Sequence, residues 1–148
     1  MRALLQRVTR AEVRVEGEVV GAVGRGLLVL LGVASSDDAA VAVALARRIV
    51  ELRIHQDEAG RTNLALRDVD GSVLAVSQFT LYADTRRGRR PGFTAAADPV
   101  HAEALYDRFC RALEEMGVAT ARGRFGQAMQ VELVNDGPFT VWLDTAER

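Results

Sequence analysis

The feature that most constrains the fold is residues 26–33, an unbroken run of glycine, leucine and valine. A strand that is apolar on both faces has to be covered on both faces. We therefore expect residues 26–33 to form a central strand packed between other elements. A membrane span needs about 20 apolar residues, so this run predicts a buried strand. We find no signal peptide or membrane segment in the sequence.

Shorter segments show the alternation of apolar and polar residues that is typical of half-buried strands. Gly17 reads as a hairpin turn between two of them. The predicted strands are residues 2–8, 11–16, 18–23, 26–33, 52–55, 63–66, 73–79, 118–122, 129–134 and 139–143.

Two segments have helical spacing of apolar residues and N-terminal capping signals. The first helix is predicted over residues 37–51, with Ser36 as its N-cap. The second begins at Asp98 with Pro99 in the first helical position and ends at Gly117. We therefore expect residues 1–148 to form one compact α+β domain, with two helices packed on a largely antiparallel, barrel-like sheet.

All 19 basic residues are arginines, against 20 acidic residues, so the net charge is −1. The absence of lysine excludes Schiff-base chemistry and the lysine-dependent phosphate loop. A near-neutral chain is also a poor candidate for coating nucleic acid without sequence preference. A cluster of four arginines, Arg86, Arg87, Arg89 and Arg90, leaves two interpretations open: a solvated loop, or a local contact with phosphates.

The usual catalytic and metal-binding patterns are missing. His55 and His101 are the only histidines, they lie 46 positions apart, and no His or Cys spacing suits a metal. Cys110 lies beside the apolar stripe of the second predicted helix, which favours a core thiol over a nucleophile. We expect no metal and no cofactor.

Two polar segments interrupt predicted strand ends, residues 77–80 and residues 135–140. Main-chain N–H groups at a strand end can together stabilise a developing oxyanion, which allows acyl transfer without an ionisable side chain. Ordinary turns are the alternative interpretation, since Ser, Thr, Asn, Asp and Gly form turns in any protein. The Gly137–Pro138 bond can also adopt the cis form in a tight turn.

The residues also match a known family. The sequence resembles the D-aminoacyl-tRNA deacylases, also called D-tyrosyl-tRNA deacylases, over essentially its whole length. The matching motifs are Leu5-Gln6-Arg7-Val8, Ala11-x-Val13, the 26–32 strand, Ser77-Gln78-Phe79-Thr80-Leu81, Gly88-Arg89-Arg90-Pro91, Phe125-Gly126 with Met129, and Asn135-Asp136-Gly137-Pro138. One residue departs from the family pattern: Gln127 stands where a small residue is expected after Phe125-Gly126.

The resemblance implies a cytoplasmic homodimer that hydrolyses the ester of D-aminoacyl-tRNA, and also glycyl-tRNA. A cis Gly137–Pro138 turn held by Arg7 would enter the partner's site and reject L-amino acids by steric clash. Water would attack the ester, assisted by the 2′-hydroxyl of the terminal adenosine. The implied catalytic residues are Ser77, Gln78, Phe79 and Thr80, the implied substrate-binding residues are Gly137, Pro138, Arg7, Met129 and Phe125, and the partner is the acceptor end of tRNA rather than DNA.

Two alternatives remain open at this point. Thr80 could act as a covalent nucleophile, although no neighbouring base would activate its hydroxyl. The chain could instead be a nucleic-acid binding module without catalysis. That module would be expected to show a strongly basic face with stacking aromatic residues, and the aromatic residues of this sequence are scattered.

Overall fold

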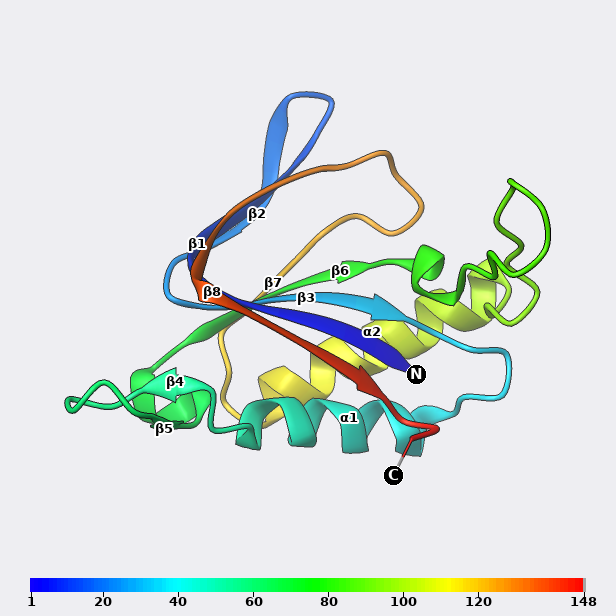
Figure 1. Cartoon of the computed structure of the whole chain (residues 1–148). Helices are drawn as coiled ribbons and strands as arrows, with labels where there is room; N and C mark the ends of the chain where they lie inside the picture. The colour runs from blue at the N-terminus through cyan, green and yellow to red at the C-terminus, as the bar shows by residue number, and fades with distance from the viewer. Residues whose placement is uncertain (148) are drawn as a thin grey trace.

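The sheet is built on two long antiparallel strands, β1 (Arg2–Val15) and β8 (Gln130–Asp144), which pair along most of their length (Figure 1). The computed structural model describes residues 1–147. Along its other edge β1 pairs first with β3 and then with β2, and β3 continues the sheet through parallel pairing with β6, which pairs with β7. The remaining strands are β2 (Glu18–Val23), β3 (Gly26–Gly32), β4 (His55–Gln56), β5 (Thr62–Leu64), β6 (Ser72–Ser77) and β7 (Thr120–Arg122).

The sheet curls until its ends almost meet. A Cβ atom placed on Gly21 of β2 would lie 2.6 Å from the carbonyl oxygen of Arg122 on β7, so the two strands pass in close contact there. The β1–β2, β1–β3, β1–β8 and β4–β5 pairs are antiparallel, and the β3–β6 and β6–β7 pairs are parallel. The predicted α+β domain with a largely antiparallel, barrel-like sheet is confirmed.

Two helices, α1 (Ala39–Glu51) and α2 (Pro99–Glu115), pack together across one face of the sheet (Figure 1). Strand β3 is buried on both faces, as the unbroken apolar run of residues 26–33 predicts. Leu27 and Leu31 face the core under the helices, whereas Leu28 faces a second core inside the curl of the sheet. In the described part of the chain, no helix is long and apolar enough to cross a membrane.

The start of the second helix is predicted correctly, but that of the first is not. Asp98 caps α2 by accepting bonds from two main-chain N–H groups, and Pro99 follows it. The cap of α1 is Asp38, whose side chain accepts a bond from the N–H of Val41, rather than Ser36. Adjacent serine and aspartate residues all suit this role, so the sequence does not distinguish them.

Several predicted strand boundaries are wrong. The separate strands predicted at 2–8 and 11–16 are one strand, β1. Two consecutive exposed residues, Thr9 and Arg10, interrupt its alternation at the point where β1 changes partner, which is why the sequence pattern suggests a break. Strands 129–134 and 139–143 are likewise one strand, β8. Two 3₁₀ helices were not predicted, η1 (Leu66–Val69) and η2 (Phe79–Tyr82), and strands 52–55, 63–66, 73–79 and 118–122 are shortened or shifted to β4, β5, β6 and β7.

Candidate active site

Residues 77–80 form a corner where β6 ends and η2 begins, here called the strand-end corner. The N–H of Gln78 donates a 2.7 Å hydrogen bond to the carbonyl of Leu31, which fixes the corner to the end of β3. Among the described residues, the N–H groups of Phe79 and Thr80 donate no main-chain hydrogen bond, as is usual at the start of a helical turn. Both residues are exposed, Phe79 by 55%. Two main-chain donors are therefore available to a ligand here.

The side chains of Gln78 and Thr80 contact each other at this corner. The Gln78 Nε2 donates a hydrogen bond to the Thr80 Oγ1. An amide cannot remove a proton from a hydroxyl, so this contact orients Thr80 without activating it as a nucleophile. None of the four side chains of the corner titrates near neutral pH.

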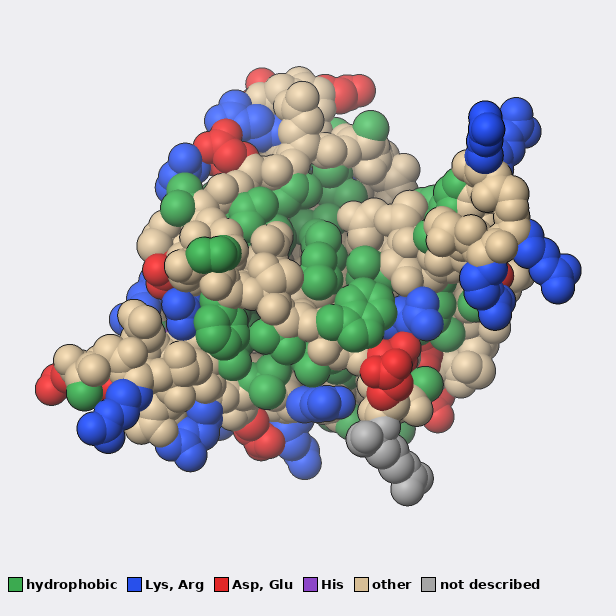
Figure 2. Space-filling view, in the orientation of Figure 1, with side chains coloured by type: hydrophobic (Ala, Val, Ile, Leu, Met, Phe, Trp, Pro, Cys, Tyr) green, Lys and Arg blue, Asp and Glu red, His purple; other side chains and the backbone are tan. Residues whose placement is uncertain are grey.

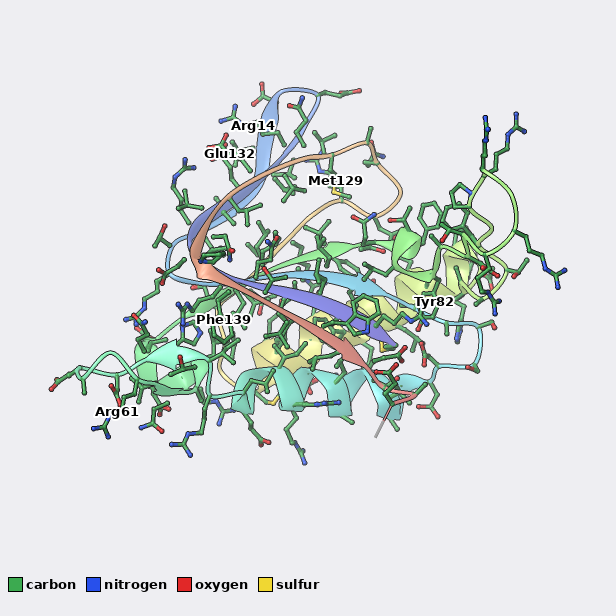
Figure 3. The ribbon with its side chains drawn as sticks, viewed as in Figure 1. Arg14, Arg61, Tyr82, Met129, Glu132 and Phe139 are labelled. Atoms are coloured by element: carbon green, nitrogen blue, oxygen red, sulfur yellow. The ribbon has the colours of Figure 1, made fainter. Side chains whose placement is uncertain are left out.

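The connection between β7 and β8 brings Phe125 and Met129 to the same end of β6. Gly123 donates a 2.9 Å main-chain bond to Ala75. The Phe125 ring lies 6.2 Å from the ring of Tyr106, whose hydroxyl donates to the same Ala75 carbonyl. Met129, labelled in Figure 3, packs on the core cluster that contains Val76. The predicted residues Ser77, Gln78, Phe79, Thr80, Phe125 and Met129 thus gather around the last residues of β6.

A second group of predicted residues forms a bulge in β8. Gln6 pairs with Thr140 and Val8 pairs with Asn135, so residues 136–139 of β8 lie opposite the single residue Arg7. These four residues are called the β8 bulge. It contains the Gly137–Pro138 bond, which is cis, and both residues are exposed. Gly137 has φ +149°, and a Cβ atom there would lie 2.7 Å from the nitrogen of Phe139, so the bulge requires glycine.

Asn135 closes the β8 bulge through its side chain. Its Nδ2 donates to the carbonyls of Arg7 and Phe139, at 2.9 and 3.0 Å, and its Oδ1 accepts a 3.1 Å bond from the Phe139 N–H. Asn135 is part of the matching motif, but no role is predicted for it from the sequence. Its position at the start of a polar strand interruption was the available signal.

Arg7 lies on β1 opposite the bulge, contacts it through its side chain, and is only 4% exposed. Its Nε donates a 2.8 Å bond to the carbonyl of Asp136, and its Nη1 donates a 2.7 Å bond to the carbonyl of Ile54. The guanidinium also lies 4.7 Å from the centre of the Phe139 ring and 3.5 Å from the Asp136 carboxylate. Arg7 therefore connects the bulge to the segment before β4.

His55 is buried near Arg7 and is not an acid–base catalyst for the strand-end corner. It is 1% exposed, and its Nε2 has no hydrogen-bond partner in the described part of the chain. Burial, and secondarily the charges of Arg25 and Arg7, lower the pKa of His55 to about 4. The imidazole is consequently neutral at physiological pH.

The lowered pKa of His55 predicts a loss of stability in mild acid. The unfolded chain binds a proton at His55 below about pH 6.5, whereas the folded chain does so only near pH 4. The contribution of His55 to the free energy of unfolding is therefore constant above about pH 6.5. Between pH 6.5 and pH 4 it lowers this free energy by on the order of 3 kcal/mol. Urea unfolding at pH 7.5, 6, 5 and 4.5 should show this fall in the wild type and in the control His101→Gln. The fall should be much smaller in His55→Gln, and parallel curves for all three proteins would contradict it.

The two groups of residues do not meet within one chain. The strand-end corner is bonded to Leu31, while Arg7 pairs with Leu27, so they lie about 13 Å apart along the strand direction, and the bulge is a further two strand spacings, about 10 Å, across the sheet. Figure 3 likewise places Phe139, in the bulge, apart from Tyr82, at the end of η2. The single chain thus leaves Arg7, Gly137 and Pro138 away from the strand-end corner.

Arg2, which is not among the predicted site residues, also contacts the segment that follows the strand-end corner. Its Nη1 donates a 2.9 Å bond to the carbonyl of Leu81 in η2, and its Nε donates a 2.8 Å bond to Asp144. The guanidinium lies 4.5 Å from the centre of the Tyr82 ring. No local pattern indicates this role, because the contacts depend on β1 and β8 pairing near their ends.

Cys110 has the buried position expected of it, and the second histidine contacts a neighbouring loop. Cys110 is fully buried, and burial raises the pKa of its thiol to about 11, so it holds no reactive thiolate near neutral pH. The Nε2 of His101 lies 2.9 Å from the carbonyl of Asp37, beside α1. Neither residue is part of the strand-end corner.

The corner offers two free main-chain N–H donors, an amide and a hydroxyl, on a small α+β fold. Main-chain donors of this kind can stabilise an oxyanion during acyl transfer, which is a chemistry of hydrolases. The sequence family model described as D-Tyr-tRNA(Tyr) deacylase matches residues 4–144. The chain belongs to this family, and the predicted resemblance and hydrolase class are confirmed.

Individual relatives extend over nearly the whole chain. The D-aminoacyl-tRNA deacylase of Anaeromyxobacter dehalogenans is 59% identical over 145 residues, covering 98% of this chain and 97% of that protein. The enzyme of the same name from Paracoccus denitrificans is 53% identical, covering 100% and 99%. The solved structure of the c-Myc DNA Unwinding Element Binding Protein has a TM-score of 0.91 and 38% identity, covering 98% and 99%. A probable eukaryotic D-amino acid tRNA deacylase shares the fold, with a TM-score of 0.84 at 19% identity over 96% and 97%.

Proposed function

We propose that this protein hydrolyses the ester bond of D-aminoacyl-tRNA and releases the free D-amino acid and tRNA. The observation that carries the proposal is the pair of unpaired N–H groups at Phe79 and Thr80, in a chain whose relatives bear the name of this deacylase. Because translation uses aminoacyl-tRNA in the cytoplasm, we expect the enzyme to act there.

In the proposed reaction, water attacks the ester carbonyl carbon and the carbonyl oxygen becomes negatively charged. The N–H groups of Phe79 and Thr80 donate to this oxygen, and each such donor is worth roughly 10²–10³ in rate. The amide of Gln78 positions the ester. The bond to the ribose 3′-oxygen then breaks, and that oxygen takes up a proton to give the 3′-hydroxyl of the tRNA.

The proton transfers need a group that the strand-end corner does not supply. Its side chains are a serine, a glutamine, a phenylalanine and a threonine. The 2′-hydroxyl of the terminal adenosine lies next to the ester in any such substrate, so we assign it the transfer of the proton from the attacking water. Phe125 and Met129, at the same end of β6, supply apolar surface for the adenine.

We further propose that the complete site forms between two copies of the chain. Gly137 and Pro138 are exposed and lie far from the strand-end corner of their own chain. The outer edge of β8 pairs with no other described strand and carries the exposed apolar residues Val134 and Trp142. A long unpaired edge of this kind is a surface for association with another chain. In the homodimer, each β8 bulge would reach the corner of the partner.

The same arrangement gives a physical basis for chiral selection. The β8 bulge presents main-chain carbonyls that can bind the α-amino group of the substrate. Its position leaves no room for a side chain in the L orientation, whereas a D side chain points away. Selection by steric clash accepts many D side chains, and it excludes glycine poorly because glycine has no side chain.

The test compares one tRNA charged with D-tyrosine and with L-tyrosine at equal enzyme concentration. We expect rapid loss of the D ester while the L ester persists. Equal rates would indicate a general esterase and contradict the chiral proposal. Loss of neither ester, with uncharged tRNA bound as tightly as charged tRNA, would favour a binding module and overturn the proposed function.

A further inference from the structure

Residues 84–92, here called the arginine loop, form a closed excursion between η2 and α2. Asp84 and Gly92 exchange two main-chain hydrogen bonds, of 2.7 and 2.9 Å, at its base. The Asp84 carboxylate binds both the Nε and the Nη2 of Arg86, at 2.9 and 2.7 Å. Arg86 is therefore used in holding the base of the loop.

The other three arginines of the loop are exposed and form no ion pair with any described residue. They are Arg87, Arg89 and Arg90, on either side of Gly88, whose φ of +76° turns the chain at the tip. Figure 2 shows basic side chains projecting from the body of the protein at the place where Figure 1 draws this loop. Three guanidinium groups thus project from one short loop.

The charge of the loop is opposite to that of the rest of the chain. Residues 84–92 hold four arginines and one aspartate, which gives +3, and the remaining 15 basic and 19 acidic residues give −4. A polyanion is therefore attracted to the positively charged arginine loop and weakly repelled by the net negative charge of the rest of the protein. This distribution favours orientation of the partner over general adhesion.

The loop is anchored next to the strand-end corner. Phe93, directly after its base, packs edge-on against Phe79, with ring centroids 4.9 Å apart. The ester of the proposed substrate binds at Phe79 and Thr80, beside this contact, and the polynucleotide continues from the terminal adenosine of the same substrate. The arginine loop is consequently placed to meet that part of the RNA.

We propose that Arg87, Arg89 and Arg90 bind phosphates of the tRNA acceptor arm and thereby select esters carried on a polynucleotide. The inference rests on the proposed function. Guanidinium groups pair with phosphate oxygens in a bidentate manner, without reading the bases. The loop would then add affinity for every tRNA while the corner and the β8 bulge select the amino acid.

The experiment uses two substrates, D-tyrosyl-tRNA and 3′-O-D-tyrosyl-adenosine, which has the same ester and no phosphodiester. The variant is Arg87→Gln/Arg89→Gln/Arg90→Gln. On the tRNA substrate, we expect its kcat/KM to fall roughly 10- to 100-fold in 0.1 M salt, mostly through KM, and the slope of log kcat/KM against log salt to decrease by about 2. On the adenosine ester, kcat/KM should stay unchanged.

A matched control removes three exposed arginines from the helices, Arg47→Gln/Arg48→Gln/Arg111→Gln, and should leave both substrates unaffected. An equal fall for the two substrates, an unchanged rate on tRNA, or an equal effect of the control would overturn the inference. If the wild type hydrolyses neither ester, the proposed function fails. The binding of uncharged tRNA then decides the inference, because the loop variant must still bind it more weakly than the control.

Discussion

Replacement of Arg7 by methionine should lower the free energy of unfolding by about 2–4 kcal/mol and remove most deacylase activity. Methionine keeps an apolar side chain against Phe139, but it supplies no donor for the carbonyls of Asp136 and Ile54, which both bind the Arg7 guanidinium. The β8 bulge would lose the group that holds it. Urea unfolding and the rates on D-tyrosyl-tRNA and L-tyrosyl-tRNA measure the two effects.

The control for this experiment is Arg10→Met on the same strand. Arg10 forms a 2.7 Å ion pair with Glu132 in which both side chains are more than half exposed. Exposed pairs of this kind contribute between 0 and about 1 kcal/mol. Similar losses of stability in the Arg7 and Arg10 variants would show that the buried contacts of Arg7 are not what holds the bulge.

A substrate with a 2′-deoxy terminal adenosine should react at least about 10²-fold more slowly than the normal ester, because a positioned acid–base group typically contributes 10²–10⁴. The strand-end corner contains no ionisable side chain that could take over the proton transfer. The rate should be divided by the uncatalysed rate of the same substrate, since removal of the 2′-hydroxyl also slows spontaneous hydrolysis.

A tRNA with 2′-deoxycytidine next to the terminal adenosine is the matched control for the deoxy substrate and should react normally. An unchanged ratio of catalysed to uncatalysed rates for the 2′-deoxyadenosine ester would place the proton transfer on the protein. The Thr80 hydroxyl would then be the first group to examine, as it lies next to the two main-chain donors.

The sequence predicted those parts of the fold that depend on local pattern. Residues 26–33 have an apolar pattern on both faces, and β3 is buried between two cores. Asp98 and Pro99 form an unambiguous cap, and α2 begins there. The predicted cap of α1 lies two residues early, and the predicted strand 73–79 includes the first residue of η2, because short 3₁₀ turns have no apolar period of their own.

The candidate site could be identified as a set of motifs but not as an arrangement in space. The two polar strand interruptions were visible in the sequence, and their residues lie at the end of β6 and at a bulge in β8. Their separation within one chain depends on the β1–β3 and β1–β8 registers, which involve pairs such as Gln6 and Thr140. Likewise, nothing in the residues around His55 indicates that a two-residue strand will bury an imidazole beside Arg7.

The continuity of β8 through the bulge sets how this protein can change in length. Ladder pairs with β1 flank the bulge on both sides, so an insertion or deletion within residues 131–134 or 141–143 would shift part of the strand by one position. Such a slip turns inward-facing side chains outward. The arginine loop, in contrast, lies outside the sheet and is closed only at its base, so it can lengthen or shorten freely. Insertions and deletions are therefore barred from the element that carries Gly137 and Pro138, while the segment proposed to meet the RNA can accept them.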